Sequence, residues 1–360
     1  MISGDRLAVQ GKQGAFTATL EEFSKHFDRI DIICPRVTDA KVQRIGNVYF
    51  YPSPWGLLRQ PKWILQKGSE LIATHKHAVM TVHDYPPFYN GLGAKKLSKK
   101  TGVSAVSEIH HIVGYPRAAS FAEVVGRIMT RKALPSLHAH FAAVRTVTQS
   151  VKNLLAEFGV EEKKVTVVPS VYLDHSLVEK VRNTPKKYDL VFSARLVDNK
   201  GLIPLLDAVS RLQSVTLLVI GDGPVRKKAE EKAKSLKISD RVTFTGWLPT
   251  ADSVASAISS AKIFVMNSKS EGNPRVAVEA MAYGLPVIAT KVGIMPDIVI
   301  ENVNGLFSDG SSKDLVKKIE SVIHDASKIS SMGTEASKIL AKFEKKTAIA
   351  AYANFLKSVQ

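Results

Sequence analysis

Two glutamates eight residues apart, Glu271 and Glu279, are the acidic pair best placed to do chemistry. Carboxylates at both positions can accept hydrogen bonds from vicinal hydroxyls, as on a sugar or a ribose. Taken alone, two acids at this spacing are most often solvated side chains. Here the segment 270–289 is punctuated by glycine and proline and is preceded by a strand expected at 263–267. This context favours a binding role.

The residues around this pair predict a loop followed by a helix. Asn273 can cap the helix, Pro274 suits its first position, and Gly284 suits the position after its last turn. The first turn of a helix presents unpaired N–H groups and the positive end of the helix dipole, which favour a phosphate or a polyhydroxylated ligand. We therefore expect Glu271 in the loop and Glu279 inside a helix of about ten residues.

A second charged group, Arg195 and Lys200, follows a strand expected at 189–194. Open α/β sheets bind ligands at the carboxyl ends of their strands. The planar fork of arginine and the compact charge of lysine together suit a diphosphate and can neutralise a departing phosphate. Surface ion pairing is the alternative. Nearby, the turn at 221–223 is a weaker signal, and the strand end at 242–249 is a plausible wall for a nucleobase.

Histidine and acidic spacings give little support for a metal site. The chain contains no Asp-x-Asp pair, and the two His-x-His pairs, at 75–77 and 138–140, have no evident cysteine or carboxylate partner. We expect no metal, because Arg195, Lys200 and a helix N-terminus can stabilise a diphosphate without one. Asp84 is a further polar group that leaves a strand, and an acceptor-side role is one option for it.

The elements that position these residues follow from length and patterning. Short β-branched runs alternate with amphipathic segments throughout, which is typical of parallel α/β sheets. At 360 residues, two domains are favoured. We place the first at 1–174, a linker at 175–187, and the second at 188–344. Residues 1–4 resemble the tail of a first strand whose earlier residues are missing. Either this strand is clipped, or the start codon has been assigned downstream of the true one.

Strands and helices are expected at specific places in both halves. In the first half we expect strands at 30–34, 78–82, 103–107, 145–148 and 165–168, and helices at 16–26 and 150–158. In the second half we expect strands at 189–194, 216–220, 242–245, 263–267 and 287–290.

Composition excludes several classes of protein. With 45% apolar and 23% charged residues, the chain is not disordered, collagen-like or a coiled coil. Cys34 is its one cysteine, which excludes an internal disulfide framework. No apolar stretch is long enough to span a membrane and the N-terminus lacks a secretory pattern, so we expect a cytoplasmic protein.

Charge is the unusual property, at a formal net charge of +17. Residues 41–156 hold sixteen lysines and arginines but four acids, which suggests an anionic partner such as a phosphorylated substrate or an anionic membrane. A solvated lysine-rich surface is the alternative, and nucleic acid is disfavoured because no basic–aromatic pattern is present. The segment 121–132 combines an apolar stripe with basic residues, so it predicts either a membrane-surface helix or a core-facing one.

Taken in order, the segments 193–201, 216–224, 242–249 and 270–289 resemble the C-terminal domain of retaining GT-B glycosyltransferases of family 4 (glycosyl transferases group 1). The likeness extends more loosely over 146–174 and departs at Ser170, where an Asn-Gly turn is commoner. The resemblance implies two doubly wound, Rossmann-like domains facing across a cleft. It also implies that the C-terminal helix at 345–360 returns to the first domain.

The resemblance assigns roles by position. Arg195 and Lys200 would bind the donor diphosphate, and Glu279 the ribose. A histidine near the reacting carbon would be His110, with His111 as the alternative. The remaining donor-binding residues implied are Glu271 and Gly272, Asn273, Pro274 and Arg275 for the sugar hydroxyls, Gly246 beside the base, and Gly14 (or, less favoured, Gly11) near the phosphates.

The predicted function is transfer of a sugar from a nucleotide-diphosphate sugar to an acceptor hydroxyl with retention of anomeric configuration. The acceptor would be a lipid-linked or cell-surface glycan, with the enzyme peripheral on the inner face of the membrane and free of cofactors. Two alternatives remain open: a nucleotide-sugar epimerase of the same fold, and a non-catalytic nucleotide-sugar-binding protein.

Overall fold

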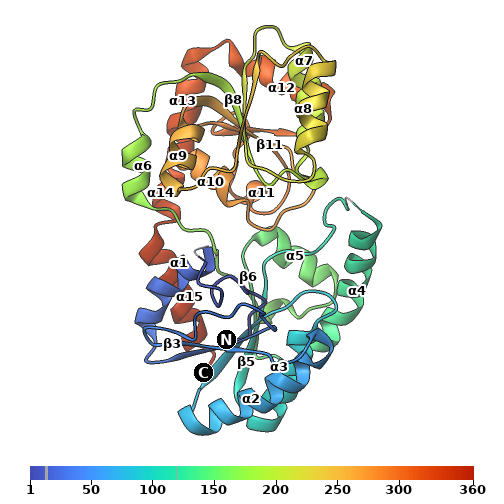
Figure 1. Cartoon of the computed structure of the whole chain (residues 1–360), viewed down its shortest axis with the longest axis vertical. Coiled ribbons are helices and arrows are strands. Elements are labelled where there is room, and N and C mark those ends of the chain that lie inside the picture. Colours follow the sequence, from blue (N-terminus) through green and yellow to red (C-terminus); the bar gives the residue numbers. More distant parts are fainter. Residues whose placement is uncertain (13–14, 119) are drawn as a thin grey trace. The chain divides into compact units, whose positions relative to one another are not determined.

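A computed structural model describes residues 1–12, 15–118 and 120–360, which fold into two compact units (Figure 1). We call them unit 1 and unit 2. Unit 1 comprises Met1–Val113, Val124–Ser170 and Lys346–Gln360, and unit 2 comprises Gly114–Glu123 and Val171–Lys345. Each unit is an α/β layer structure around a parallel sheet, which confirms the predicted fold class.

Unit 1 contains two groups of strands, in the orders β1-β3-β2 and β4-β5-β6-β7. All neighbours are parallel except β2 and β3. The strands are β1 (Ile30–Cys34), β2 (Arg44–Ile45), β3 (Val48–Pro52), β4 (Val79–His83), β5 (Ser104–Ile109), β6 (Ala143–Thr146) and β7 (Val165–Val167).

The first residues of the chain join the two groups of strands. The Ile2 amide donates to the Thr81 carbonyl at 2.8 Å, and the Ser3 amide donates to the Ile33 carbonyl at 3.0 Å. Ile2 thus forms parallel bridges to both β1 and β4 and is buried. Residues 1–3 behave as a very short central strand, in agreement with their strand-like pattern.

Helices cover the sheet of unit 1, and the last of them comes from the C-terminus. Tyr352 of this helix stacks on Phe23 of the first helix, with ring centroids 4.8 Å apart. The helices are α1 (Ala15–Phe23), α2 (Gln60–His75), α3 (Tyr89–Thr101), α4 (Phe121–His138), α5 (Gln149–Glu157) and α15 (Lys345–Lys357), with short 3-10 turns at Ser24–His26, Leu57–Arg59 and Glu162–Lys164.

Unit 2 has a single six-stranded parallel sheet in the order β10-β9-β8-β11-β12-β13. The strand order reverses between β8 and β11, and such a reversal opens a crevice at the carboxyl ends of the two strands. The strands are β8 (Tyr188–Ser193), β9 (Leu217–Ile220), β10 (Val242–Gly246), β11 (Ala261–Met266), β12 (Val287–Thr290) and β13 (Gly305–Ser308).

Both faces of this sheet are covered by helices, and an apolar core lies on each side. β9 and β12 are buried at every position and β11 at every position except Lys262, so these inner strands consist largely of apolar residues. The helices of unit 2 are α6 (His175–Val181), α7 (Leu202–Arg211), α8 (Arg226–Ser235), α9 (Ala251–Ser259), α10 (Arg275–Ala282), α11 (Met295–Ile298), α12 (Ser312–Ile323), α13 (Ala326–Ser337) and α14 (Ile339–Lys342), with a 3-10 turn at Asp198–Lys200.

The expected strands are present, with ends displaced by at most a few residues, whereas β2, β3 and β13 were not anticipated. Two local details differ from the sequence pattern. The helix behind Glu271 has eight residues and begins at Arg275, so Pro274 rather than Asn273 is its N-cap, and no side chain caps it. The predicted linker 175–187 is helical in its first half, because Asp174 accepts a hydrogen bond from the Ser176 amide and starts α6.

Candidate functional site

The first candidate site lies in unit 2, at the reversal of strand order. Arg195 follows β8 and is exposed, and no ion pair to it exists within the described residues. Lys200 ends the 3-10 turn that comes next. Gly201 follows with a φ of +70°, and a Cβ there would lie 2.1 Å from the Asn267 carbonyl oxygen. Only glycine therefore lets this turn pack against the end of β11.

This packing joins the two predicted groups of the donor site. Lys200 Nζ forms an ion pair with the Glu271 carboxylate, and Ser268 Oγ donates to the same carboxylate at 2.8 Å. Asn199 Nδ2 holds the loop by donating to the Ser270 carbonyl at 3.0 Å. The Lys200 and Glu271 side chains are 22% and 16% exposed, so solvent still reaches the pair. Each side chain can therefore give up this ion pair and contact a ligand instead.

The second glutamate of the motif is engaged by its own helix. Arg275 Nε donates to Glu279 Oε1 at 2.8 Å, and the guanidinium lies over the Tyr172 ring, 4.8 Å from its centroid. Burial raises the pKa of Glu279, while the neighbouring Arg275 acts in the opposite direction. The structure therefore makes Glu279 a half-buried acceptor held in a fixed orientation, as hydroxyl recognition requires.

Several glycines of this edge serve close packing. Gly246 has a φ of +72° and its carbonyl accepts from the Gly221 amide at 2.9 Å. A Cβ on Gly221 would lie 2.0 Å from the Ala194 carbonyl oxygen, and one on Gly293 would lie 2.3 Å from that of Gly272. These contacts fix the strand ends around Arg195 and the Glu271 loop. At the end of β10, Trp247 presents an indole that is 75% exposed.

Asn273 and Pro274 lie in the loop before α10, where Asn273 is partly buried and makes interactions with its surroundings. Gly14 lies outside the described residues, so the structure does not describe the predicted phosphate loop there. Gly11, the other candidate, has a φ of +74° in an exposed turn.

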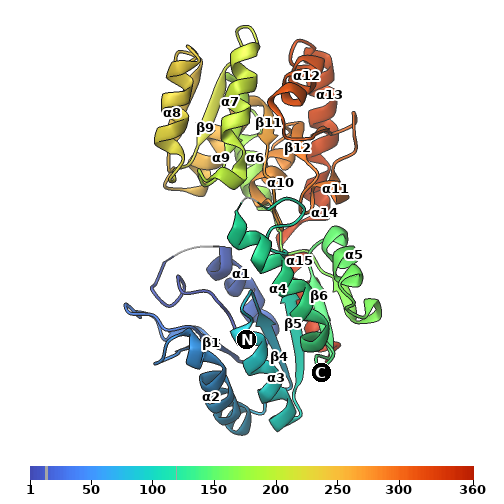
Figure 2. The same ribbon diagram turned by 90° about the vertical axis from the view of Figure 1, so that its right-hand side faces the viewer.

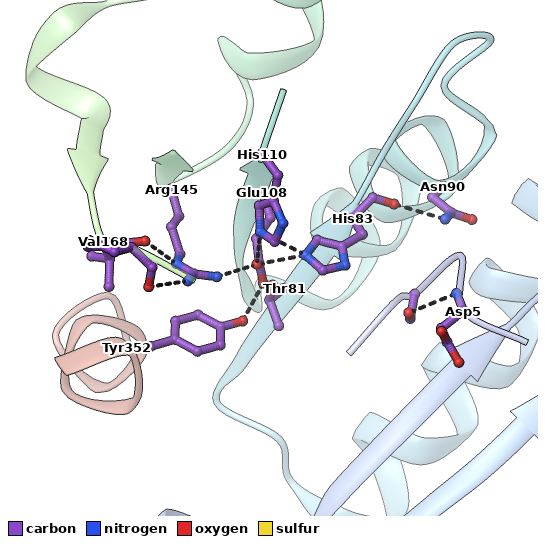
Figure 3. Close-up of polar contacts among 11 residues, drawn as sticks. Asp5, Thr81, His83, Asn90, Glu108, His110, Arg145, Val168 and Tyr352 are labelled. Atoms are coloured by element: carbon purple, nitrogen blue, oxygen red, sulfur yellow. Dashed lines mark hydrogen bonds and ion pairs between the residues drawn. The ribbon is translucent and has the colours of Figure 1, made fainter. Parts of the chain in front are cut away.

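A second candidate site lies in unit 1, at the carboxyl ends of β4, β5 and β6. The strand register aligns His83 with Glu108, and Glu108 with Arg145. His110 follows Glu108 by two residues, just past the end of β5. Figure 3 shows the four side chains converging on one point, with Glu108 in the middle.

Glu108 is buried in a central strand and its charge is compensated from several sides. Arg145 Nη1 donates to Oε2 at 2.7 Å, and the hydroxyls of Thr81 and Tyr352 donate to Oε1. Burial raises the pKa of the Glu108 carboxyl, but the charges of His83 and Arg145 outweigh burial and hold it well below its usual range. Glu108 is therefore an anion at neutral pH.

The imidazoles of His83 and His110 contact this carboxylate and remain open to solvent. Their Nε2 atoms lie 2.9 Å and 3.2 Å from Glu108 Oε2 and 3.1 Å from each other. About a quarter of each side chain is exposed. Burial and the nearby charge of His83 lower the pKa of His110 to about 4, so His110 is neutral at pH 7 and can accept as well as donate a hydrogen bond.

These three residues are also a group that could hold a metal ion, because one ligand atom from each lies within 4.8 Å of the others. The Arg145 guanidinium on the same carboxylate oxygen places a fixed positive charge beside that position, which opposes a cation there. The arrangement therefore favours a hydrogen-bonded cluster.

Sequence reasoning found His110 but missed the rest of this cluster, namely His83, Glu108, Arg145 and Tyr352. The sequence does predict that parallel strands bring their carboxyl ends to one edge of the sheet. It does not predict the strand register that aligns these residues with one another. Asp84, one residue past His83, is instead buried and accepts from the Gly91 amide at 2.8 Å in the first turn of α3. It anchors that helix rather than facing a ligand.

The basic amphipathic segment of the first half forms α4, and its apolar stripe is exposed. The core-facing alternative is therefore wrong. The exposed apolar residues are Phe121, Val125, Ile128 and Met129. Figure 2 shows α3 beside α4, and Lys95 of α3 reaches the Ser136 carbonyl of α4 at 3.5 Å. Arg131 and Lys132 follow the stripe on α4 and are exposed, and Lys96, Lys99 and Lys100 are exposed on α3.

Comparison with protein families gives two matches that divide the chain between them. Residues 176–339 match the family described as Glycosyl transferases group 1, and residues 16–171 match Glycosyltransferase Family 4. Among the helices in the described part of the chain, none has the length and apolar character needed to cross a membrane.

Similar sequences are glycosyltransferases by name. The chain is 32% identical to sulfoquinovosyl transferase SQD2 of Arabidopsis thaliana over 44% of this chain and 31% of that protein. It is 31% identical to the lipopolysaccharide core biosynthesis glycosyltransferase LpsE of Rhizobium meliloti over 49% and 52%. It is also 31% identical to a GDP-mannose-dependent alpha-(1-6)-phosphatidylinositol monomannoside mannosyltransferase of Mycobacterium tuberculosis over 47% of each. The chain thus spans about half, or less, of the length of these relatives.

Similar structures cover the whole chain and show its fold. Sucrose-phosphate synthase from Thermosynechococcus elongatus superimposes with a TM-score of 0.83 at 17% identity, over 99% of this chain and 98% of that one. Anabaena Alr3699/HepE in complex with UDP and glucose superimposes with a TM-score of 0.74 at 20% identity, over 99% and 98%.

Proposed function

Because residues 176–339 match the glycosyl transferases group 1 and the chain has the GT-B fold, we propose that it is a retaining glycosyltransferase with a nucleotide-diphosphate sugar as donor. The observation that carries the proposal is the grouping of Arg195, Lys200 and Glu271 at the reversal of strand order in unit 2. A free arginine and an exchangeable lysine–carboxylate pair supply cations for a diphosphate and an acceptor for sugar hydroxyls.

The donor site follows from these side chains. Arg195 and Lys200 bind the diphosphate, while Glu271, released from Lys200, accepts hydrogen bonds from sugar hydroxyls. Glu279 takes the ribose hydroxyls, and Trp247 beside Gly246 offers a face for the base. The backbone of residues 272–275 completes the sugar side. The UDP present in the Anabaena neighbour supports a nucleotide donor of this kind.

In the proposed reaction the bond between the anomeric carbon and the diphosphate oxygen breaks while a bond to the acceptor hydroxyl forms on the same face. The hydroxyl proton passes to the departing phosphate oxygen. Arg195 and Lys200 stabilise the charge that grows on the diphosphate. These roles need no metal or cofactor.

An activity assay of the wild-type protein tests this function. Wild-type protein incubated with a panel of nucleotide sugars and lipid-linked glycans should release a nucleoside diphosphate only when acceptor is present. NMR of the product should show the anomeric configuration of the donor. A nucleotide-sugar epimerase would instead turn over donor without acceptor, and a binding protein would bind donor without turnover.

The Arg195→Ala variant should lower kcat/KM by about 10-fold to 100-fold, the value of one charge-assisted contact. Arg211→Ala, at an exposed arginine of α7 in the same unit, is the matched control and should keep full activity. Equal activity of the two variants would contradict the assigned donor site.

For the acceptor, we propose a lipid-linked or cell-surface glycan that the enzyme meets at the inner face of the cell membrane. The exposed apolar stripe of α4, with basic residues beside it and on α3, fits an anionic lipid surface. Phosphatidylinositol occurs in the names of several relatives, among them the mannosyltransferase of Mycobacterium tuberculosis, which supports a lipid-linked acceptor.

Vesicle binding tests this location. The protein should co-sediment with vesicles that contain anionic lipid and not with purely zwitterionic ones. Arg131→Gln with Lys132→Gln should weaken binding about 30-fold, at roughly 1 kcal/mol for each basic residue. Leu58→Ser, at an apolar side chain of unit 1 that is 83% exposed but outside this surface, should leave binding unchanged. Equal binding to vesicles with and without anionic lipid would contradict the proposal.

A further inference from the structure

Unit 2 has a second groove at the amino ends of β8 and β11, which we call the basic groove. Its volume is about 720 Å³, and it is lined by Lys186 just before β8, by the start of β11 and by parts of α6, α10, α12, α13 and α14. Arg195 lies past the opposite, carboxyl end of β8, whose six residues span roughly 20 Å. The basic groove is therefore separate from the proposed donor site.

The lining of the basic groove carries positive charge. Among the described residues that line it, none is acidic and four are basic or can become so: Arg182, Lys186, Lys262 and His324. Arg182 and Lys262 form ion pairs with carboxylates that are not part of the lining, at 2.7 and 2.8 Å. A guanidinium or an ammonium has more hydrogens than one such contact uses, so both side chains keep donors for a ligand. The charge of the lining favours an anionic ligand.

Lys186 has no carboxylate partner in the described part of the chain. Its Nζ donates to the Ser259 carbonyl oxygen at 2.9 Å, at the C-terminal end of α9. Burial lowers the pKa of Lys186, because it disfavours the charged ammonium. An anion bound in the groove would supply the opposite charge that Lys186 lacks and would stabilise its protonated form.

The helix α13 adds hydroxyl groups to the lining. Ser330, Thr334 and Ser337 are spaced four and three residues apart, so they lie on one face of the helix. The hydroxyls of Thr334 and Ser337 donate to main-chain carbonyl oxygens of the same helix, at 3.0 and 2.7 Å. Since each hydroxyl has one hydrogen, these two oxygens are left as acceptors. They suit a ligand that brings hydroxyl donors of its own.

The rest of the lining is mostly apolar and is held by close packing. Val178, Ile329 and Leu340 line the groove together with the end of α10. A Cβ on Gly333 would lie 2.3 Å from the Gly284 carbonyl oxygen, so glycine lets α13 approach the end of α10. Apolar walls with a small number of polar groups are typical of pockets for small molecules. The C–H faces of a sugar ring can pack on such walls.

We propose that the basic groove is a second ligand site of unit 2, which binds a phosphate monoester with free hydroxyls, such as a hexose phosphate. Arg182, Lys186 and Lys262 bind the phosphate, while Thr334 and Ser337 accept hydrogen bonds from the hydroxyls. The proposal does not rest on the glycosyltransferase function, because no residue of the proposed donor site takes part.

NMR of the full chain with labelled isoleucine methyl groups locates the ligand, with glucose 6-phosphate as the probe. The probe should shift the signals of Ile323 and Ile329, which line the groove, and Ile329→Val assigns one of them. The signal of Ile64, buried in unit 1, should not move. Glucose alone should bind much more weakly than glucose 6-phosphate, because it lacks the charge that the cations recognise. Equal binding of the two would contradict the proposal.

Calorimetry of variants identifies the contacts. Arg182→Gln with Lys186→Gln should weaken binding of glucose 6-phosphate about 100-fold, at about tenfold for each charge-assisted contact. Lys187→Gln, at an exposed lysine that is not part of the lining, is the matched control and should bind as the wild type does. Thr334→Val removes a hydroxyl and keeps the shape of the side chain. It should weaken binding of glucose 6-phosphate but not of inorganic phosphate.

The same chemistry occurs on the headgroup of a phosphorylated lipid, and vesicles that contain phosphatidylinositol 4-phosphate distinguish the two sources. If the ligand is a headgroup, Arg182→Gln with Lys186→Gln should co-sediment with these vesicles less than Lys187→Gln does. If the ligand is a soluble molecule, the two proteins should co-sediment equally.

Three further outcomes would overturn the proposal. The first is a wild-type protein in which glucose 6-phosphate shifts neither isoleucine signal. The second is equal affinity of the double variant and of Lys187→Gln for the probe. The third is loss of the binding in Arg195→Ala, which would place the probe at the donor site. The first needs no variant, so the test stands even if the double variant does not fold. Failure of the wild type to transfer any sugar would refute the proposed function and leave this site unaffected.

Discussion

Replacing Asp84 by asparagine should stabilise unit 1 at high pH and have little effect at low pH. The carboxyl group is 5% exposed and accepts backbone hydrogen bonds, with the Gly91 amide 2.8 Å away. Burial outweighs these bonds and raises the pKa of Asp84 from 3.8 to about 7. Asparagine has nearly the same shape, can accept the same hydrogen bond and carries no charge to desolvate.

The sign and size of the effect follow from proton linkage. Above pH 4 the unfolded chain has lost the Asp84 proton, whereas the folded chain keeps it until about pH 7. The unfolded state therefore binds fewer protons in this window, and stability falls as pH rises from about 4 to 7. The shift of about three pKa units corresponds to about 4 kcal/mol in full. Asp84→Asn should remove this loss, so the two proteins should diverge across that window and differ by a constant amount above it.

Urea unfolding followed by tryptophan fluorescence measures this difference. In a Trp247→Phe background the remaining tryptophans, Trp55 and Trp63, both lie in unit 1, so the signal reports that unit. A variant that is less stable than wild type at pH 8, or a difference that does not change between pH 4 and pH 8, would refute the reasoning.

Asp31 supplies a control in which the Asp→Asn substitution should change the stability of unit 1 in the opposite direction. Burial raises its pKa, but hydrogen bonds from His77 and Arg29 outweigh burial and lower it from 3.8 to about 2. Its stabilisation is present above pH 4 and is lost as pH falls toward 2. Asp31→Asn should therefore destabilise unit 1 by about 2 kcal/mol at neutral pH, and the destabilisation should shrink as the solution becomes acidic.

Two further predictions concern the donor site. Gly201→Ala should displace Lys200, because its Cβ would lie 2.1 Å from the Asn267 carbonyl oxygen just after β11. Calorimetry should then show nucleotide-sugar binding that is about tenfold or more weaker. The control is Gly102→Ala, where φ is similar but nothing lies within 4 Å; it should cost about 1 kcal/mol of stability and leave binding unchanged. Trp247→Ala should lower affinity for the nucleoside diphosphate about tenfold, the value of one aromatic contact. The unfolding midpoint should not change, since Trp247 is 75% exposed. Unaltered affinity would show that Trp247 does not contact the base.

Local pattern predicted the repeating elements well because each depends on neighbours in sequence. The apolar run at 30–34 forms β1, and Gly284 ends α10 with a φ of +82°, as its position predicts. The start of α10 was misplaced by one residue, because both Asn273 and Pro274 are acceptable there and the packing of the loop decides between them. The short strand β13 was missed because its four residues carry little pattern of their own.

The sequence by itself predicted the fold class, the resemblance to a family and the Glu271–Glu279 motif, because periodicity, glycine turns and motif spacing are local properties. Only the tertiary structure decided what those residues touch. The Lys200–Glu271 ion pair depends on β8 lying next to β11, and the cluster around Glu108 depends on the register of β4, β5 and β6. Strand order and register arise from packing between distant segments, so no local pattern records them.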